Sequence, residues 1–170
     1  MFVRASRRGL MDLSVAVMAC VGASGPKAAT QNDSFDVTAT IVASCSITAN
    51  DLAFGNYDPL SVTDLDQTAT ISVTCSSGAT YDIQLSAGLS GNVAARTMDD
   101  DATGTNLLNY SLFIDSGRTN NWGVTNGTDT YQGTGTGAAQ VVTVYGRIPA
   151  GQTTPPVGTY ADTITATIEY

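Results

Sequence analysis

Side chains that could do chemistry are few in this chain, and the commonest catalytic type is absent. There is no histidine, which removes the commonest general base and the commonest metal ligand. Serine and threonine are abundant, but the only lysine, Lys27, lies near the start of the chain. Beyond it, no hydroxyl has a histidine or lysine base with which to form an ordinary nucleophile–base pair. We therefore predict a protein that is not an enzyme and needs no cofactor.

The acidic stretch "MDDDATGT", residues 98–105, offers oxygen ligands at alternating positions, which suit a calcium ion. It lacks the glycine and the distal glutamate of the known twelve-residue calcium loop. A solvated acidic loop is the favoured interpretation, and we predict no metal site.

Trp122, within "NNWG", could stack on a sugar or fill the end of a β-sandwich. The second role is favoured, and the first leaves a carbohydrate-binding module as an alternative function.

Two cysteines, Cys45 and Cys75, remain once an export signal is set aside. An even number of cysteines in an exported chain indicates a disulfide. The alternation supports this pairing, because each cysteine lies on the apolar side of its own extended segment. Two lone cysteines are too few for a metal site, and a catalytic thiol needs a base.

Short alternating segments between turns predict an all-β protein. The expected strands are 35–47, 69–76, 80–88, 107–115, 139–148 and 160–170, while 91–106 and 116–137 are expected to be loops. In the last strand every second residue from Tyr160 to Tyr170 lies on one mostly apolar face. This spacing is typical of an antiparallel β-sandwich.

From Thr30 onward the chain has three arginines against fourteen acidic residues, a net charge of −11. Three scattered arginines make no basic patch, so we predict no binding to nucleic acid or to an anionic membrane surface. The acidity is interpreted as a contribution to solubility.

Residues 1–29 resemble an export signal, with three arginines before an apolar stretch that Asp12 interrupts. Cleavage is expected after Ala23 or Ala29. The apolar stretch is too short to span a bilayer, so we predict no membrane insertion. Cys20, within "VMAC", loosely resembles a lipidation site, and ordinary cleavage is favoured over lipidation.

Several motifs occur in order over nearly all of residues 35–170. They are "SCSIT", "LAFGNYDPL", "ISVTCSSGATYDIQLSAG", "RTM", "LNYSLFID", "WG" and "VYGRIPAGQ", followed by "VGTYADTITATIEY". Together they resemble the spore coat protein U domain, the family that includes pilins of archaic (Csu-type) chaperone–usher systems. The resemblance implies an immunoglobulin-like β-sandwich that lacks its last strand. It also implies a periplasmic chaperone and then, at an outer-membrane usher, the N-terminal segment of the next subunit as donors of that strand.

On this resemblance, residues 30–43 are the candidate donor segment and residues 44–170 the pilin domain. The donor strand would present alternating apolar side chains: Phe35, Val37, Ala39 and Ile41. The acceptor groove would be formed by Ile164, Ala166, Ile168 and Tyr170, with Ile47, Leu52 and Phe54 beyond. The alternation alone does not decide whether residues 35–43 pair within their own domain or with another copy.

The resulting hypothesis is a fibre subunit that is exported through the periplasm to the cell surface. It would bind copies of itself or related pilins and serve attachment and biofilm formation. The alternatives are a self-contained coat or matrix protein of the same fold and the carbohydrate-binding module.

Overall fold

A computed structural model describes residues 25–100 and 105–170. The chain divides at Ala39–Thr40 into two units. In the described part of the first unit, residues 25–39, every residue is exposed and no helix or strand is assigned. Residues 1–24, with Cys20 and the Ala23 cleavage position of the predicted export signal, lie outside the described residues. No helix in the described ranges is long and apolar enough to cross a membrane.

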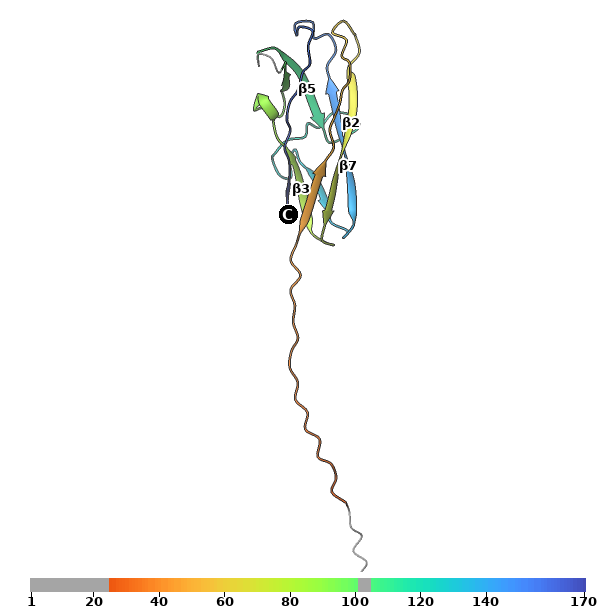
Figure 1. Ribbon diagram of the computed structural model, residues 1–170, viewed down its shortest axis with the longest axis vertical. Coiled ribbons are helices and arrows are strands. Elements are labelled where there is room, and N and C mark those ends of the chain that lie inside the picture. The colour runs from red at the N-terminus through yellow and green to blue at the C-terminus, as the bar shows by residue number, and fades with distance from the viewer. Residues whose placement is uncertain (1–24, 101–104) are drawn as a thin grey trace, which may run out of the picture. The chain divides into compact units, whose positions relative to one another are not determined.

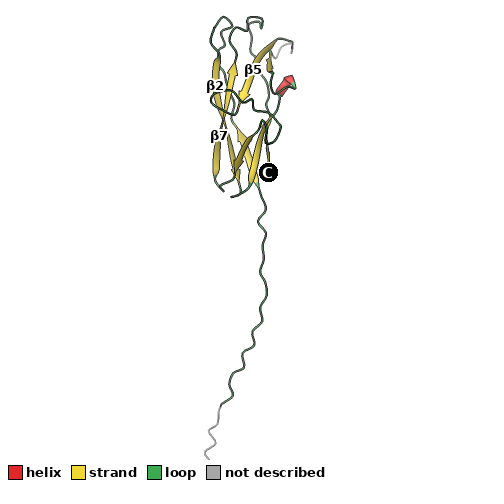
Figure 2. Ribbon diagram, turned by 180° about the vertical axis from the view of Figure 1, so that it is seen from behind, coloured by secondary structure: helices red, strands yellow, loops and turns green. Residues whose placement is uncertain are grey.

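The second unit, Thr40–Tyr170, is a β-sandwich with one short 3-10 helix, η1 (Gly88–Ser90) (Figures 1 and 2). Its strands are β1 (Cys45–Ala49), β2 (Leu65–Cys75), β3 (Thr80–Leu85), β4 (Arg96–Asp99), β5 (Leu107–Phe113), β6 (Tyr131–Thr134), β7 (Ala139–Ile148) and β8 (Ala166–Glu169). All paired strands are antiparallel. The predicted all-β sandwich is therefore confirmed.

The strands form two sheets. One has five strands in the order β1-β2-β7-β5-β4, and the other has three in the order β6-β3-β8. The pair β2–β7 is the longest in the larger sheet, and its register runs from Leu65 opposite Ile148 to Thr74 opposite Ala139. In both strands every second residue is buried, such as Ile71 and Val73 in β2 and Val142 and Val144 in β7, which is the pattern of a sheet buried on one face.

The predicted disulfide between Cys45 and Cys75 is present. The two residues lie directly opposite each other in the register of β1 and β2. Cys75 is buried and Cys45 is half-buried against the core. The bond therefore fixes the first residue of β1 to the last residue of β2.

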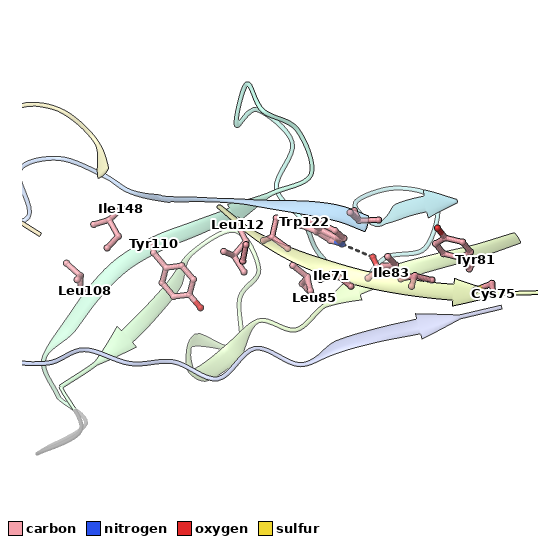
Figure 3. Packing of buried hydrophobic residues seen from close by; sticks show 14 residues of the cluster. Ile71, Cys75, Tyr81, Ile83, Leu85, Leu108, Tyr110, Leu112, Trp122 and Ile148 are labelled. Carbon is pink, nitrogen blue, oxygen red and sulfur yellow. Dashed lines mark hydrogen bonds between the residues drawn. The ribbon is translucent and has the colours of Figure 1, made fainter. Parts of the chain in front are cut away.

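Inward residues from both sheets build one apolar core (Figure 3). Ile71, Val73, Val142 and Val144 come from the larger sheet, and Ile83 and Leu85 come from the smaller one.

Trp122 is completely buried in this core, and its Nε1 donates a hydrogen bond to the carbonyl oxygen of Ile83 at 2.7 Å. The prediction that Trp122 packs inside the sandwich is right, and a ring without exposed surface cannot stack on a sugar. The carbohydrate-binding alternative therefore loses the aromatic residue on which it was built.

The two ends of the sandwich carry different loops. At the Cys45 end, where β1 begins, lie the loops 76–79 and 135–138. At the opposite end, which we call the loop end, lie the loops 55–64 and 149–160 (yellow and dark blue in Figure 1). These two loops lie at the same end because Leu65, the first residue of β2, is paired with Ile148, the last residue of β7.

Candidate functional site

Two sheet edges face each other without a strand between them. β1 is the edge of the five-stranded sheet and β8 is the edge of the three-stranded sheet, and the two strands lie close together. Neither has a second neighbouring strand within the described residues. Because unpaired N–H and C=O groups on an edge invite another strand, this pair of edges is the candidate site.

Where β1 ends and β8 begins lies a cleft of about 470 Å³, which we call the edge cleft, and Ala49 of β1 and Ala166 of β8 line it. Its walls are the segment from Ala49 to Phe54, which continues β1, and the segment from Tyr160 to Ala166, which leads into β8. Its floor is the core itself, formed by Ala69, Ile71, Leu85, Leu112 and Val144. These five floor side chains are each at most 8% exposed, so they belong to the core, and the cleft ends directly on them.

One polar pair interrupts this apolar lining. The hydroxyl of Tyr110 on β5 donates a hydrogen bond of 2.6 Å to Oδ2 of Asp162, and both residues line the edge cleft. Oδ1 of Asp162 accepts hydrogen bonds from the backbone N–H groups of Leu89 and Thr163. Burial, and then the hydrogen bond to Asp162, raise the pKa of Tyr110 well above its usual range. The hydroxyl therefore remains protonated and donates to the carboxylate, so the pair fixes the loop wall of the cleft to its floor.

A second cleft of about 660 Å³, the pole cleft, opens at the loop end. It shares Leu52, Phe54, Met98 and Tyr160 with the edge cleft, so the two clefts adjoin. Its outer wall is the segment from Pro155 to Tyr160. Leu52 and Phe54 can lie across β7 because Gly146 has no side chain: a Cβ there would come within 2.8 Å of each.

Arg96 of β4 fixes the end of β3 beside the edge cleft. Its side chain has no exposed surface, and it donates to four backbone carbonyl oxygens, those of Leu85, Ser86, Val93 and Trp122. Burial lowers the pKa of this guanidinium. Ser86 is also joined to Thr165 by two hydrogen bonds. The backbone N–H of Ser86 donates to the carbonyl oxygen of Thr165, and the backbone N–H of Thr165 donates to the hydroxyl of Ser86. Arg96 thus positions the end of β3, to which the wall segment leading into β8 is hydrogen-bonded.

The candidate donor residues lie in segments where no strand is assigned. Phe35, Val37 and Ile41 are each at least 85% exposed, and Ala39 is exposed as well. Isolated exposed apolar residues are ordinary on protein surfaces. Four of them at alternating positions in one extended segment are not, and such a pattern is typical of a strand that is buried on one face when paired.

The candidate acceptor residues are distributed along both edges. Leu52, Phe54, Ile164 and Ala166 line the edge cleft. Ile47 on β1 and Ile168 on β8 lie nearer the Cys45 end and are half-buried against the core. Tyr170 is 60% exposed and has no place in either cleft.

Sequence reasoning missed three contributors to the cleft: Arg96, Tyr110 and Asp162. Arg96 carried a signal, since it is the one basic residue in the long polar segment 91–106, but the carbonyl groups it reaches come from three separate segments. Asp162 carried a clearer signal, because it is the one acidic residue on the apolar face of residues 160–170.

The described residues contain no cluster of three potential metal ligands among His, Cys, Asp and Glu. Residues 101–104 of the acidic stretch 98–105 lie outside the described residues.

The geometry defines the class of protein: a two-sheet antiparallel sandwich with an open cleft between two edge strands, which is the fold of a chaperone–usher pilus subunit. A solved structure agrees, "CsuC-CsuE chaperone-tip adhesion subunit pre-assembly complex from archaic chaperone-usher Csu pili of Acinetobacter baumannii". The two share 26% sequence identity with a TM-score of 0.56, over 77% of this chain and 40% of that chain. This chain therefore spans well under two thirds of the length of the solved one.

The Spore Coat Protein U domain model matches residues 31–167. "Protein U" of Myxococcus xanthus is 38% identical over 91% of this chain and 93% of its own length. The chain belongs to the Spore Coat Protein U domain family. The resemblance inferred from the sequence is confirmed.

Proposed function

We propose that this chain is a structural subunit of an archaic chaperone–usher fibre and that it polymerises by strand donation between copies. The observation that carries the proposal is the edge cleft between β1 and β8, with its floor of core side chains. A strand added there would pair with two free edges and close the cleft over its apolar floor at the same time.

The donor that fits best is the segment 35–41 of another copy. Its four alternating apolar residues, Phe35, Val37, Ala39 and Ile41, would face the cleft, and burying them would contribute on the order of 5–10 kcal/mol before ordering costs. The outward residues between them are Asp36, Thr38 and Thr40, which suit a solvated face. The match to the family model includes this segment, because it begins at residue 31.

Donation between copies is favoured over pairing within one copy by the short connection to β1. β1 begins at Cys45, and the segment that continues it, from Ala49 to Phe54, forms one wall of the cleft. For residues 35–41 of the same copy to enter the cleft beside it, the chain would have to reverse within Val42, Ala43 and Ser44. Hairpin loops of this length favour glycine, asparagine or aspartate, and none is present. A strand from a second copy needs no reversal.

The proposal includes the route and the partners of the family. The solved relative is a complex with its chaperone. By analogy, a periplasmic chaperone would fill the cleft of this chain after export, and an outer-membrane usher would exchange that strand for the next subunit. The product would be a surface fibre for attachment and biofilm formation.

Two neighbouring substitutions test the proposal. Val37→Asp would place a charge on the cleft-facing side of the donor, whereas Thr38→Asp would place the same charge on its solvated side. We expect Val37→Asp to abolish polymers, because a buried carboxylate without a partner is strongly unfavourable, and Thr38→Asp to leave them intact. Gel ladders of unheated samples and light scattering would report polymer length. Equal behaviour of the two variants would contradict donation by this segment.

The alternative is a self-contained coat or matrix protein of the same fold, favoured by the likeness to the spore coat family. It predicts that the unmodified chain stays monomeric at every concentration. It also predicts that a peptide of residues 33–43 does not raise its thermal midpoint, because its own copy of the segment already fills the cleft.

A further inference from the structure

Met98 is the only methionine after residue 18, and it lies where the two clefts adjoin. It belongs to β4 and lines both the edge cleft and the pole cleft, as Leu52, Phe54 and Tyr160 do. Its side chain is half-buried and packs against the core. A cleft that accepts a strand needs apolar surface, which a leucine would supply equally well. The thioether is therefore a reactive group that strand donation itself does not use.

The side chain of Met98 faces inward and is nevertheless open to solvent. Met98 is paired with Leu108 of β5, which is 6% exposed, and it follows the fully buried Arg96 by two residues. Alternate residues of a strand share one face, so Met98 points to the same side as Arg96. Unlike Arg96, it is only half-buried and lines two open clefts. A small oxidant dissolved in water can therefore reach it.

Among the described residues, Met98 is the one side chain that a two-electron oxidant attacks readily. The other two sulfur atoms after residue 20 belong to Cys45 and Cys75, which are joined in the disulfide. Trp122 has no exposed surface. Because oxidation of sulfur depends on its chemical form and its exposure, the oxidant meets a single target in the sandwich.

The reaction is the transfer of one oxygen atom from hydrogen peroxide. A lone pair of Sδ attacks one peroxide oxygen, the O–O bond breaks and an S–O bond forms. The sulfur loses two electrons and becomes a sulfoxide, while the peroxide is reduced and its second oxygen leaves as water. The product is methionine sulfoxide, which reductases convert back to methionine.

A sulfoxide at this position would oppose the entry of a donor strand. Oxidation turns a flexible apolar side chain into a polar one whose oxygen only accepts hydrogen bonds. The hydroxyl of Tyr110, which lines the same cleft, already donates to Asp162. Water in the open cleft can solvate the new oxygen, but a donor strand would displace that water. Burying a polar group without a partner is unfavourable, so the strand would bind less tightly.

We propose that Met98 is an oxidation site that controls strand acceptance: the thioether allows a donor strand to enter the edge cleft, and the sulfoxide weakens its entry. An oxidant would then halt the growth of the fibre at the accepting subunit, and a sulfoxide reductase would restore it. This inference rests on the proposed function, since it takes strand donation as its starting point.

Peptide binding tests the proposal on the full chain carrying Val37→Asp, whose own segment does not fill the cleft of another copy. A fluorescent peptide of residues 33–43 would be titrated with this protein before and after treatment with hydrogen peroxide. Mass spectrometry would show whether Met98 gains one oxygen while free methionine in the same solution is consumed. We expect Met98 to be oxidised and the affinity for the peptide to fall by about tenfold.

Two control variants separate oxidation of Met98 from other damage. With Met98→Leu added, the affinity for the peptide should be the same before and after peroxide. With Met98→Leu and Val124→Met together, the thioether moves to a position that is 48% exposed and lies outside both clefts. This methionine should also gain an oxygen, and the affinity should again be unaffected by peroxide.

The two proposals fail in different ways. If the untreated protein does not bind the peptide at all, strand donation by this segment is wrong and the control by Met98 falls with it. If the peptide binds and Met98 resists oxidation, or binds equally well after Met98 is oxidised, the oxidation site is wrong and strand donation stands. Equal loss of affinity in the Met98→Leu protein would also overturn it.

A second measurement does not depend on a folded protein with an empty cleft. The full chain without substitutions would be unfolded in urea, treated with peroxide so that Met98 is oxidised, and diluted to refold and polymerise. We expect shorter polymers than those of the untreated chain, whereas peroxide should leave the polymers of the Met98→Leu chain unchanged in length. Polymers of equal length from oxidised and untreated chains would contradict the proposal.

Discussion

Replacing Arg96 with methionine should destabilise the sandwich far more than the loss of an ordinary surface arginine. The guanidinium donates five hydrogen bonds to four backbone carbonyl oxygens from three separate segments. Methionine fills a similar space but donates none of them. The carbonyl groups of Leu85 and Trp122 would be left in a buried environment without the donor that Arg96 supplies.

The magnitude follows from those two buried groups. Each carbonyl that loses its partner costs about 1–3 kcal/mol, which gives a gross loss of about 2–6 kcal/mol. The loss is offset in part, because Arg96 makes no ion pair with any residue that the structure describes and its burial is unfavourable, as its lowered pKa shows. We expect a net decrease of about 2–5 kcal/mol in the free energy of unfolding, a large share of the stability of a domain this size.

Arg147 provides the matched control. It pairs with Asp64 and Asp66 on the sheet surface, with its side chain about one-third exposed. Arg147→Met should therefore cost less than about 1 kcal/mol. The assay is urea unfolding of both variants with a saturating, fixed concentration of the 33–43 peptide, so that polymers do not form. Equal losses for the two variants would refute the role assigned to Arg96.

Three further changes give distinct outcomes. Replacing Cys45 and Cys75 together with serine should lower the free energy of unfolding by about 3–4 kcal/mol in urea, and an unchanged midpoint would show that the disulfide does not constrain the unfolded chain. Above about pH 10 the native state should lose stability, because tyrosines ionise in the unfolded chain while the raised pKa keeps Tyr110 protonated in the folded one. Tyr110→Phe should make this alkaline loss shallower, and an identical slope in pH-dependent thermal melts would contradict the raised pKa that burial, and then the hydrogen bond to Asp162, give Tyr110. Gly133→Ala would place a Cβ 2.4 Å from the buried ring of Tyr81, so we expect a loss of about 1–3 kcal/mol in urea unfolding, whereas an unaltered midpoint would mean that the ring moves freely.

The sequence predicted those strands that alternate clearly and pair with close partners. The segments 69–76, 80–88, 107–115 and 139–148 correspond to β2, β3, β5 and β7. The disulfide followed from the same alternation, because both cysteines lie on apolar faces. These features depend on local pattern, which a single sequence displays.

Features that depend on tertiary pairing were missed. β4 (Arg96–Asp99) and β6 (Tyr131–Thr134) fall in segments expected to be loops, and each becomes a strand through one neighbour, β5 or β3. The segment 35–47 was expected to be a strand throughout, but only Cys45 onward pairs in this single chain. Extended residues need a partner for their backbone hydrogen bonds, and alternation does not say which chain provides it.

Local alternation also predicted part of the candidate site. Ile164, Ala166 and Ile168 are half-buried as their alternation indicated, whereas Tyr170 on the same face is exposed. The polar pair of Tyr110 and Asp162 joins residues 52 positions apart, so no local pattern could reveal it.

The central claim is that the cleft between β1 and β8 receives residues 35–41 of another copy, and moving that segment tests it most directly. One protein would run from residue 30 to Tyr170. The other would lack the original segment and carry a second copy of residues 33–43 after Tyr170, joined by a short flexible linker, so that it can return along β8 in the antiparallel direction. Light scattering would give the size of each, and a thermal melt its midpoint. The account predicts a stable monomer for the rearranged protein and polymers or aggregates for the unmodified one. A stable monomer of the unmodified protein, together with destabilisation on moving the segment, would contradict it and assign the segment to its own sheet.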